Sequence, residues 1–353
     1  MLKLHKISVK LGDFELQKIS FDVEDGEYFI LLGESGIGKT VLLETIAGLI
    51  EPDDGKIFLD GKDITNEKIQ KRNIGIVYQD NGLFPHMNVR ENIMYPLECK
   101  HIDKKVIRSE LENIASVMDI IPLLDRKIKT LSGGERQKVA LARTLIMNPK
   151  ILLLDEPLSS LDTNAKAKIK TILRKINCGG QTIVHITHDY QEAISLAHRI
   201  AIMENGEISQ IGTPDEIFRH PKSQFVANFV GIKNFFRGEL IKQHNSKGDD
   251  AEFRTNGITF DVLTDVQSGS GFLIISSDDI VVSNRPPESS ARNNFYGKVI
   301  DIAPAKLGVE ITVDIGVEIS ALITRKSMES LGIDFGKDVW VSFKASAAKF
   351  IGA

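Results

Sequence analysis

A glycine-rich segment that joins an apolar strand to an apolar helix is the strongest candidate for chemistry in this chain. Residues Gly33 to Thr40 match the pattern G-x-x-x-x-G-K-[ST], and residues 28–32 before them read as a short buried strand. In this context backbone N–H groups cradle phosphates, the lysine reaches the β- and γ-phosphates, and the final hydroxyl binds Mg²⁺. The pattern therefore predicts a nucleotide phosphate site. Its expected members are Gly33, Glu34, Ser35, Gly36, Ile37, Gly38, Lys39 and Thr40.

Two carboxylates follow a second buried strand. Residues 151–154 are an apolar run of the kind found in a parallel strand covered on both faces, and Asp155 and Glu156 stand at its end. A carboxylate at Asp155 suits the Mg²⁺ shell beside Thr40. Glu156 is placed to orient or deprotonate a water that attacks the γ-phosphate. The pair therefore indicates nucleotide hydrolysis.

Two further polar side chains stand at strand ends. Residues 182–187 read as a strand that ends at His188, and the segment VYQD, residues 77–80, puts Gln79 in a similar position. Open α/β sheets place their chemistry at the carboxyl ends of parallel strands, so His188 is a candidate catalytic group. The amide of Gln79 is able to bind both Mg²⁺ and water. His185, inside the same strand, is expected to be structural.

The segment LSGGERQ, residues 131–137, opens a predicted helix with two glycines. Ser132 and Glu135 fit a capping box, in which each side chain satisfies the other residue's backbone N–H. That pairing needs neither Gly133 nor Gly134, and each glycine costs a helix roughly 1 kcal/mol relative to alanine. Because a helix N-terminus with bare N–H groups attracts anions, we interpret the glycines as a place where a phosphate closes on the backbone.

The bulk properties are those of a soluble globular protein. The 353 residues predict two domains or three, and the formal net charge of −4 argues against a nucleic-acid footprint. No run approaches the roughly 18 apolar residues of a membrane span, and residues 1–15 lack the apolar core of a signal peptide. The two cysteines, Cys99 and Cys178, lie far apart and fit a reducing compartment. We therefore expect a cytoplasmic protein.

The last third of the sequence changes to short strands with Gly, Ser and Asn turns. The segment NFFRGELI, residues 234–241, resembles NNFYGKVI, residues 293–300, which indicates a weak internal repeat. Apolar residues alternate with polar ones from Val309 to Ile319, as in half-buried strands. We predict a small β-barrel of two related halves over residues 231–353, after an α/β domain over residues 1–230.

In their order along the chain, the motifs resemble those of ATP-binding cassette (ABC) ATPases. The matching segments are the Walker A loop (33–40), Gln79, LSGGE (131–135), the Walker B strand (151–156), SSLD (159–162) and ITHD (186–189). The resemblance implies an α/β P-loop ATP-binding cassette domain with a helical subdomain, with ATP and Mg²⁺ bound and ATP hydrolysed. It also implies that Ser132, Gly133 and Gly134 contact the γ-phosphate of ATP held by a second chain. Because the chain has one Walker A loop and one LSGG segment, two complete sites need a homodimer.

One position departs from the ABC pattern. Family members often stack adenine on an aromatic residue just before the second strand, and the matching residue here is Leu11. Phe14 is nearby and is a candidate substitute. Loss of a stack costs on the order of 1 kcal/mol, which is too little to abolish nucleotide binding.

The segment after Gln79 resembles the part of importer ATPases that contacts their membrane subunits. By that resemblance, Phe84, Pro85, His86 and Met87 lie in or near the groove that receives the permease. The sequence has no membrane span of its own, so transport requires separate transmembrane permease subunits. An ordinary loop of the helical subdomain is the alternative interpretation of these residues.

The second half of the tail resembles Mop-type modules, which bind molybdate or tungstate. The resemblance lies in SARNNFYGKV, ITRKSMESLGIDFGKDV and FKAS, and it implies an all-β small-barrel (OB-like, tandem) regulatory domain. Hydroxyl and amide donors with one or two cations suit a dianionic tetrahedral oxyanion. A barrel that kept the fold without the ligand is the alternative, and SSDDI, residues 276–280 in the first half, is assigned no ligand. The matched ligand positions are Ser290, Arg292, Thr324, Ser327, Lys344 and Ser346.

Together the two resemblances imply the ATPase subunit of a binding-protein-dependent importer for molybdate or tungstate. Such a subunit works as a peripheral protein at the cytoplasmic face of the membrane, with permease subunits and an external oxyanion-binding protein as partners and no nucleic acid. Oxyanion bound to the tail is expected to inhibit import. Two alternatives stay open: the same ATPase with sulfate, iron, sugar or polyamine as cargo, and a soluble ATP-dependent oxyanion sensor or store. A DNA-repair ATPase is disfavoured by the acidic charge and by the lack of a long coiled-coil insertion.

Overall fold

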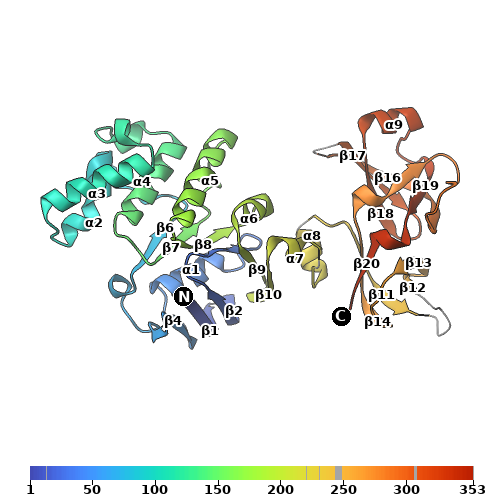
Figure 1. The fold of residues 1–353 in the computed structure, drawn as a ribbon, viewed down its shortest axis with the longest axis horizontal. Coiled ribbons are helices and arrows are strands. Elements are labelled where there is room, and N and C mark those ends of the chain that lie inside the picture. Colours follow the sequence, from blue (N-terminus) through green and yellow to red (C-terminus); the bar gives the residue numbers. More distant parts are fainter. Residues whose placement is uncertain (13, 220, 230, 243–248, 306–307, 353) are drawn as a thin grey trace. The chain divides into compact units, whose positions relative to one another are not determined.

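The computed structural model describes residues 1–12, 14–219, 221–229, 231–242, 249–305 and 308–352. The chain divides into two compact units, Met1–Arg219 and His220–Ala353 (Figure 1). The first unit combines helices with parallel and antiparallel strands, whereas the second is built mainly of antiparallel strands. The predicted fold class, an α/β cassette followed by an all-β tail, is therefore confirmed.

A six-stranded sheet forms the centre of the first unit. Its strands are β3 (Tyr28–Leu32), β6 (Ile74–Val77), β7 (Ile151–Asp155), β8 (Thr182–Thr187), β9 (Arg199–Glu204) and β10 (Glu207–Gly212). They lie in the order β10-β9-β3-β8-β7-β6, and every neighbouring pair is parallel except β9 and β10. Strands β3, β7 and β8 are buried along their whole length, which explains their continuous apolar sequences. Their carboxyl ends therefore meet at one edge of the sheet.

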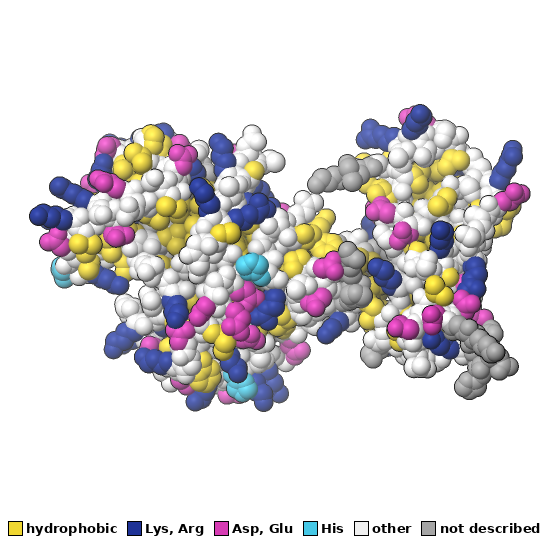
Figure 2. All heavy atoms as spheres, viewed as in Figure 1, with side chains coloured by type: hydrophobic (Ala, Val, Ile, Leu, Met, Phe, Trp, Pro, Cys, Tyr) yellow, Lys and Arg dark blue, Asp and Glu magenta, His cyan; other side chains and the backbone are white. Residues whose placement is uncertain are grey.

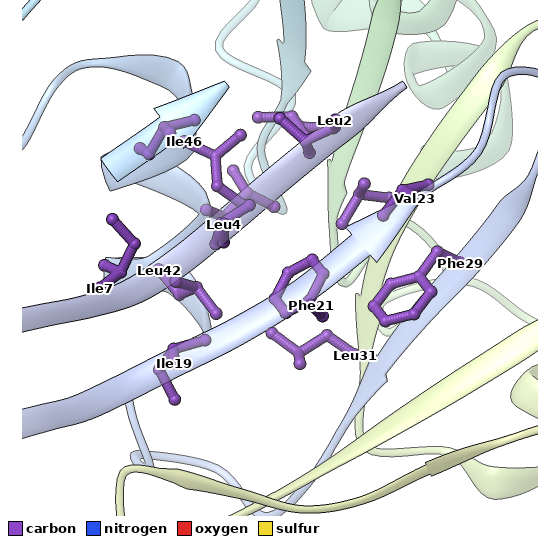
Figure 3. Packing of buried hydrophobic residues seen from close by; sticks show 14 of the residues in the cluster. Leu2, Leu4, Ile7, Ile19, Phe21, Val23, Phe29, Leu31, Leu42 and Ile46 are labelled. Atoms are coloured by element: carbon purple, nitrogen blue, oxygen red, sulfur yellow. The ribbon is translucent and has the colours of Figure 1, made fainter. Parts of the chain in front are cut away.

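A second, antiparallel sheet shares a core with the first. Its strands are β1 (Leu2–Leu11), β2 (Phe14–Val23), β4 (Asp54–Leu59) and β5 (Lys62–Asp63), in the order β2-β1-β4-β5. Figure 3 shows side chains of β1 and β2 meeting those of helix α1 (Lys39–Ala47) and strand β3 in one apolar layer. Phe21 of β2 stacks on Phe29 of β3 with their ring centroids 4.9 Å apart. This packing fixes α1, and with it the phosphate loop, against both sheets.

Helices gather at one side of the first unit to form a helical subdomain (Figure 1). There α2 (Val89–Cys99) contacts both α3 (Lys104–Val117) and α4 (Gly133–Leu145), and α4 also contacts α5 (Thr163–Cys178). Helix α2 begins at a capping box formed by Asn88 and Glu91, and α5 begins at the side chain of Asp162. The other helices of this unit are α6 (Tyr190–Leu196), α7 (Pro214–Arg219), and the 3₁₀ turns η1 (Ile69–Lys71), η2 (Ile121–Leu123) and η3 (Ile128–Thr130).

The second unit consists of two five-stranded sheets around one apolar core. The strands are β11 (Asn234–Ile241), β12 (Asp250–Thr255), β13 (Ile258–Leu263), β14 (Gly269–Ile275), β15 (Val281–Ser283), β16 (Asn293–Ala305), β17 (Gly308–Asp314), β18 (Glu318–Ile323), β19 (Asp338–Phe343) and β20 (Ala348–Gly352). The other elements are α8 (Gln224–Phe229), α9 (Arg325–Leu331), η4 (Ser277–Asp279) and η5 (Ala345–Ala347). The sheet orders are β13-β12-β11-β14-β20 and β15-β19-β16-β17-β18.

The two sheets have the same topology, which explains the sequence repeat. Strands β11, β12 and β13 form a meander, as do β16, β17 and β18, and β14 and β19 pair at corresponding places. The last strand of each half is exchanged, because β15 follows β14 but pairs with β19, and β20 follows β19 but pairs with β14. The tail is thus two related halves that complete one another.

The repeated residues occupy equivalent and demanding positions. A Cβ at Gly238 would lie 2.1 Å from the carbonyl oxygen of Arg254, and a Cβ at Gly297 would lie 2.3 Å from that of Asp314. The side chains of Asn234 and Asn293 are buried, and each binds the backbone of a strand in the other half, at Ser320 and Asp261 respectively. The repeated glycines therefore lie where strands approach closely, and the repeated asparagines lie where the two halves are joined.

The alternating run from Val309 to Ile319 forms a hairpin rather than one strand. Val309, Ile311 and Val313 of β17 and Ile319 of β18 are buried, as their spacing indicates. The chain turns between Asp314 and Glu318, where Gly316 has a φ of 103° and the N–H of Ile315 donates to the carbonyl oxygen of Val317. The alternation of apolar and polar residues predicts the buried face correctly but does not predict the turn.

The surface drawn in Figure 2 carries acidic and basic side chains side by side on each unit. On that face the coloured residues form no broad field of a single charge, in keeping with a formal net charge of −4. Among the described residues, the structure contains no helix that is both long enough and apolar enough to cross a membrane.

Candidate functional site

The predicted phosphate loop lies between β3 and α1. Gly36 and Gly38 have φ values of 86° and 95°, in the left-handed region that glycine adopts without strain. The Nζ of Lys39 donates to the carbonyl oxygens of Gly33 at 2.8 Å and Glu34 at 2.6 Å, so the loop closes around its own lysine. The ammonium group therefore already sits where the loop would surround phosphate oxygens.

Buried side chains of both charges, Lys39 and Asp155, lie at this loop. Burial lowers the pKa of Lys39, although the nearby carboxylates of Glu156 and Asp155 act in the opposite direction. Burial also raises the pKa of Asp155, and Glu156 raises it further, while a hydrogen bond from Thr40 and the charge of Lys39 lower it. The Thr40 hydroxyl donates to Asp155 Oδ2 at 3.0 Å. A buried carboxylate beside a hydroxyl is an oxygen donor set that fits Mg²⁺.

Glu156 and His188 come together at the carboxyl ends of β7 and β8. Glu156 Oε1 lies 2.9 Å from His188 Nδ1, and the Glu156 side chain is 16 % exposed against 50 % for His188. The backbone N–H of Glu156 donates to the carbonyl oxygen of Ile186 at 3.0 Å. A carboxylate with an imidazole at hydrogen-bond distance is a suitable base and orienting group for a water molecule.

Gln79 reaches the same place through Ser159. Its Nε2 donates to Ser159 Oγ at 3.2 Å, and Ser159 Oγ donates in turn to the carbonyl oxygen of Glu156 at 3.0 Å. The sequence motif SSLD includes Ser159 but does not indicate these contacts. Gln79 lies 80 positions away along the chain, and the contact with Glu156 is made to its backbone. The structure thus brings together Gln79, Asp155, Glu156 and His188, all four predicted catalytic or metal-binding groups outside the loop.

His185 has the structural place that its position inside β8 predicts. It is fully buried, burial lowers its pKa to about 3, and its Nδ1 lies 2.9 Å from the hydroxyl of Tyr28. The next turn is held by Thr187, whose Oγ1 donates to Glu192 Oε2 at 2.9 Å and accepts from the N–H of Asp189 at 3.0 Å. These buried contacts fix the backbone on both sides of His188.

The capping box predicted at the start of α4 is present. Ser132 Oγ accepts from the N–H of Glu135 at 3.3 Å, and Glu135 Oε2 accepts from the N–H of Ser132 at 2.8 Å. The two glycines also have a reason within the chain. A Cβ at Gly133 would lie 3.3 Å from Leu161 Cδ2, and a Cβ at Gly134 would lie 3.1 Å from the Cβ of Ala165. Close packing against the segment after β7 therefore favours glycine here in addition to any phosphate.

A groove of about 410 Å³ opens beside this helix start. Ser132 and Gly134 line it, together with the cations Lys138 and Lys168 and the carboxylates Asp119, Glu135 and Asp162. The helix N-terminus and the lysines attract anions, whereas the three carboxylates oppose an anion there. The assignment of Ser132, Gly133 and Gly134 to a second chain's ATP stays a prediction.

The segment with Phe84 is tied to the helix that begins at Gly133. Arg143 of α4 donates to the carbonyl oxygens of Gly82 at 2.8 Å and Asn81 at 3.1 Å, and its guanidinium lies 5.2 Å from the centroid of the Phe84 ring. The N–H of Phe84 donates to Asn92 Oδ1 at 2.8 Å. The predicted permease-contacting segment is therefore held by two helices of the helical subdomain.

Leu11 and Phe14 are the two residues that the sequence offers for contact with adenine. Leu11, at the end of β1, is 46 % exposed. Phe14 is half-buried, and its ring lies against the phosphate loop, since a Cβ at Gly38 would meet Phe14 Cζ. Phe14 thus lies beside the loop that would hold the phosphates, while Leu11 offers an apolar but non-aromatic surface.

A cavity of about 590 Å³ in the tail gathers three of the six predicted oxyanion residues. Ser290, Lys344 and Ser346 line it. The carboxylates of Asp278 and Asp279, in the segment that was assigned no ligand, line the same cavity. An anion there would therefore depend on cations to offset two nearby negative charges.

The other three predicted oxyanion residues lie outside the lining of this cavity. Arg292 forms an ion pair with Asp250, and both side chains are about half exposed. Thr324 is the N-cap of α9, where its Oγ1 accepts from the N–H of Ser327 at 3.0 Å and lies 2.9 Å from Ser327 Oγ. Within one chain, the six residues therefore form one cavity group and two separate groups.

Comparisons with known proteins agree with both parts of the chain. Residues 16–159 match the family model described as ABC transporter, and residues 289–350 match the model described as TOBE domain. Over 99 % of its length and 99 % of the relative's, the chain is 42 % identical to a "Molybdate/tungstate import ATP-binding protein" of Pyrococcus abyssi. Over 96 % of its length and 95 % of the relative's, it is 34 % identical to a "Sulfate/thiosulfate import ATP-binding protein" of Thermosynechococcus vestitus.

A solved structure gives the same picture for the first unit. It is described as a dimeric ATP-binding cassette in a post-hydrolysis state, bound to ADP and Pi. The match has a TM-score of 0.54 and 30 % sequence identity, and it covers 61 % of this chain and 99 % of that one. That share of the chain is close to the extent of the α/β unit.

Proposed function

We propose that ATP hydrolysis by this chain, which belongs to the ABC transporter family of import ATP-binding proteins, drives the uptake of molybdate or tungstate. Membership in this family confirms the predicted ATPase class. The observation that carries the cargo is full-length similarity at 42 % identity to a molybdate/tungstate relative, against 34 % for a sulfate/thiosulfate relative. Because that similarity extends through the tail, it includes the part of the chain proposed to bind the oxyanion.

In the proposed cycle the phosphate loop and Lys39 bind the phosphates of ATP. Thr40, Gln79 and Asp155 would hold Mg²⁺, which would supply positive charge beside the transferred phosphoryl group. Glu156 accepts a proton from the attacking water, and His188, 2.9 Å from its carboxylate, orients both. Gln79, Asp155, Glu156 and His188 lie at or just after the carboxyl ends of parallel strands, whereas Lys39 and Thr40 begin the helix after the phosphate loop.

The proposed working assembly is a homodimer on separate membrane subunits. Ser132, Gly133 and Gly134 of one chain close on the ATP of the other, because each chain supplies one phosphate loop and one LSGG segment. The segment from Phe84 to Met87 contacts the permease at the cytoplasmic face of the membrane. An external oxyanion-binding protein delivers the cargo.

The tail is proposed to report the cytoplasmic oxyanion concentration. Ser290, Lys344 and Ser346 line one cavity, and a tetrahedral dianion suits their hydroxyl and ammonium donors. Arg292, Thr324 and Ser327 lie outside that lining. In this proposal a second chain supplies them, so that the site is completed across the dimer and its occupation holds the nucleotide units apart.

This regulation predicts inhibition by the cargo itself. ATPase turnover of the complete transporter is measured while molybdate, tungstate or sulfate is titrated. A 100-fold preference of the anion for the open state would contribute about 2.7 kcal/mol to the coupling, enough to suppress turnover. We expect molybdate and tungstate to inhibit and sulfate to have no effect. The double variant Arg292→Ala plus Lys344→Ala should lose inhibition, while Arg254→Ala, which removes an exposed tail cation outside the site, should keep it.

Two results would count against this regulation. Turnover that ignores all three anions would remove the sensor role of the tail. Inhibition that persists after both cations are replaced would show that the anion acts elsewhere. Inhibition by sulfate alone would instead support the cargo of the sulfate/thiosulfate relative.

A further inference from the structure

The backbone of Glu156 is held in an unfavourable conformation. Its φ is 43°, in the left-handed region that costs a residue with a Cβ about 1 kcal/mol or more. Pro157 follows directly, which narrows the backbone choices of Glu156 further. Strained backbone persists only where surrounding contacts hold it, so those contacts decide where the carboxylate points.

Three hydrogen bonds among the described residues hold the backbone of Glu156. Its N–H donates to the carbonyl oxygen of Ile186 at 3.0 Å, which ties it to β8. Its carbonyl oxygen accepts from the N–H of Ser159 at 3.2 Å and from the Ser159 hydroxyl at 3.0 Å. The two backbone N–H contacts do not depend on the side chain at either position. The hydroxyl of Ser159 is thus the one side-chain donor on this strained peptide among the contacts of the described residues.

The same hydroxyl also has an acceptor role. The Nε2 of Gln79 donates to Ser159 Oγ at 3.2 Å. One Ser159 hydroxyl therefore connects the Gln79 segment to the backbone of Glu156, whose side chain contacts His188. Gln79 is followed closely by the segment that Arg143 and Asn92 hold. A displacement of Gln79 would change the hydrogen bonding of Ser159 directly.

We propose that Ser159 is a positioning residue that fixes the turn of Glu156 and links it to Gln79. The inference rests on the proposed role of Glu156 as the base. With the hydroxyl present, the Glu156 carbonyl and the Gln79 amide share one partner, so the carboxylate keeps a single orientation toward the attacking water. The Ser159 hydroxyl contacts Gln79 and the Glu156 backbone, and in this proposal it acts only through these two neighbours.

Replacing the hydroxyl tests this role. Ser159→Ala should lower kcat about tenfold, the equivalent of roughly one hydrogen bond, while KM and ATP affinity change less than about twofold. Ser159→Thr keeps a hydroxyl and should restore most of the activity. Ser116→Ala removes an exposed hydroxyl of α3, outside every motif named above, and serves as the matched control, with wild-type kcat expected. Wild-type kcat in Ser159→Ala, or an equal loss in Ser116→Ala, would overturn the proposal.

A second variant separates this inference from the proposed function. In the Glu156→Gln background, single-turnover hydrolysis should not fall further when Ser159→Ala is added, because Ser159 acts through the carboxylate that is already missing. A further loss there would show a general structural defect and would overturn the positioning role. If Glu156→Gln alone leaves turnover normal, the proposed base itself is wrong, whatever Ser159→Ala does.

Discussion

Glu156→Gln is expected to lower kcat at least about 100-fold while the affinity for ATP stays within about twofold of wild type. Glutamine keeps the size of the side chain and a hydrogen bond to His188, but its amide cannot accept the proton of the attacking water. The phosphate contacts of Lys39 and the loop are untouched. A dimer that binds ATP but does not hydrolyse it should therefore persist in the presence of Mg²⁺.

The measurement combines phosphate release with nucleotide binding and size-exclusion chromatography. Glu112→Gln, which neutralises an exposed glutamate of α3, is the matched control and should behave as wild type. Normal phosphate release from Glu156→Gln would remove Glu156 from the catalytic role. Loss of ATP binding would show instead that Glu156 stabilises the phosphate loop.

Ser132→Arg is expected to weaken ATP-driven dimer formation by at least about 100-fold, or about 2.7 kcal/mol, while a single chain still binds ATP. The arginine side chain would fill the space above the N-terminus of α4 that the partner's γ-phosphate needs. The chain's own phosphate loop lies on other elements, so it should be unaffected. Sedimentation with and without ATP, in the Glu156→Gln background, measures the effect.

A smaller substitution at the same position separates crowding from loss of the helix cap. Ser132→Ala removes the hydroxyl that caps α4, at a cost of about 1 kcal/mol, but adds no bulk. It should dimerise much better than Ser132→Arg. If Ser132→Arg dimerises normally, Gly133 and Gly134 serve only the packing against Leu161 and Ala165.

The elements that form the proposed nucleotide site were predictable because their signals are local. The strand at residues 28–32, the loop after it and the cap at Ser132 each depend on neighbours within a few positions, and all are present. The same holds for the buried strand that ends at Asp155. The contact of Ser159 with Gln79 was not predictable, because 80 positions separate the two residues and neither pattern implies the other.

In the tail, too, the features that depend on residues far apart in the sequence were not predictable. Alternation from Val309 onward indicates a buried face, but it does not show that the chain reverses at Gly316. The exchange of β15 and β20 between the halves depends on pairings made far along the chain. Arg292, matched by its motif to an anion, pairs with Asp250 in the structure. That ion pair joins residues 42 positions apart, and the motif around Arg292 does not indicate it.

Uptake into proteoliposomes tests the central claim, that ATP hydrolysis by this chain drives oxyanion import. The chain is reconstituted with its permease subunits and oxyanion-binding protein, and radiolabelled molybdate and tungstate are followed with ATP and Mg²⁺ present. We predict accumulation that requires ATP, is abolished by Glu156→Gln and is not diminished by excess sulfate. Accumulation that continues in Glu156→Gln, or ATP-driven uptake of sulfate but of neither molybdate nor tungstate, would contradict the account.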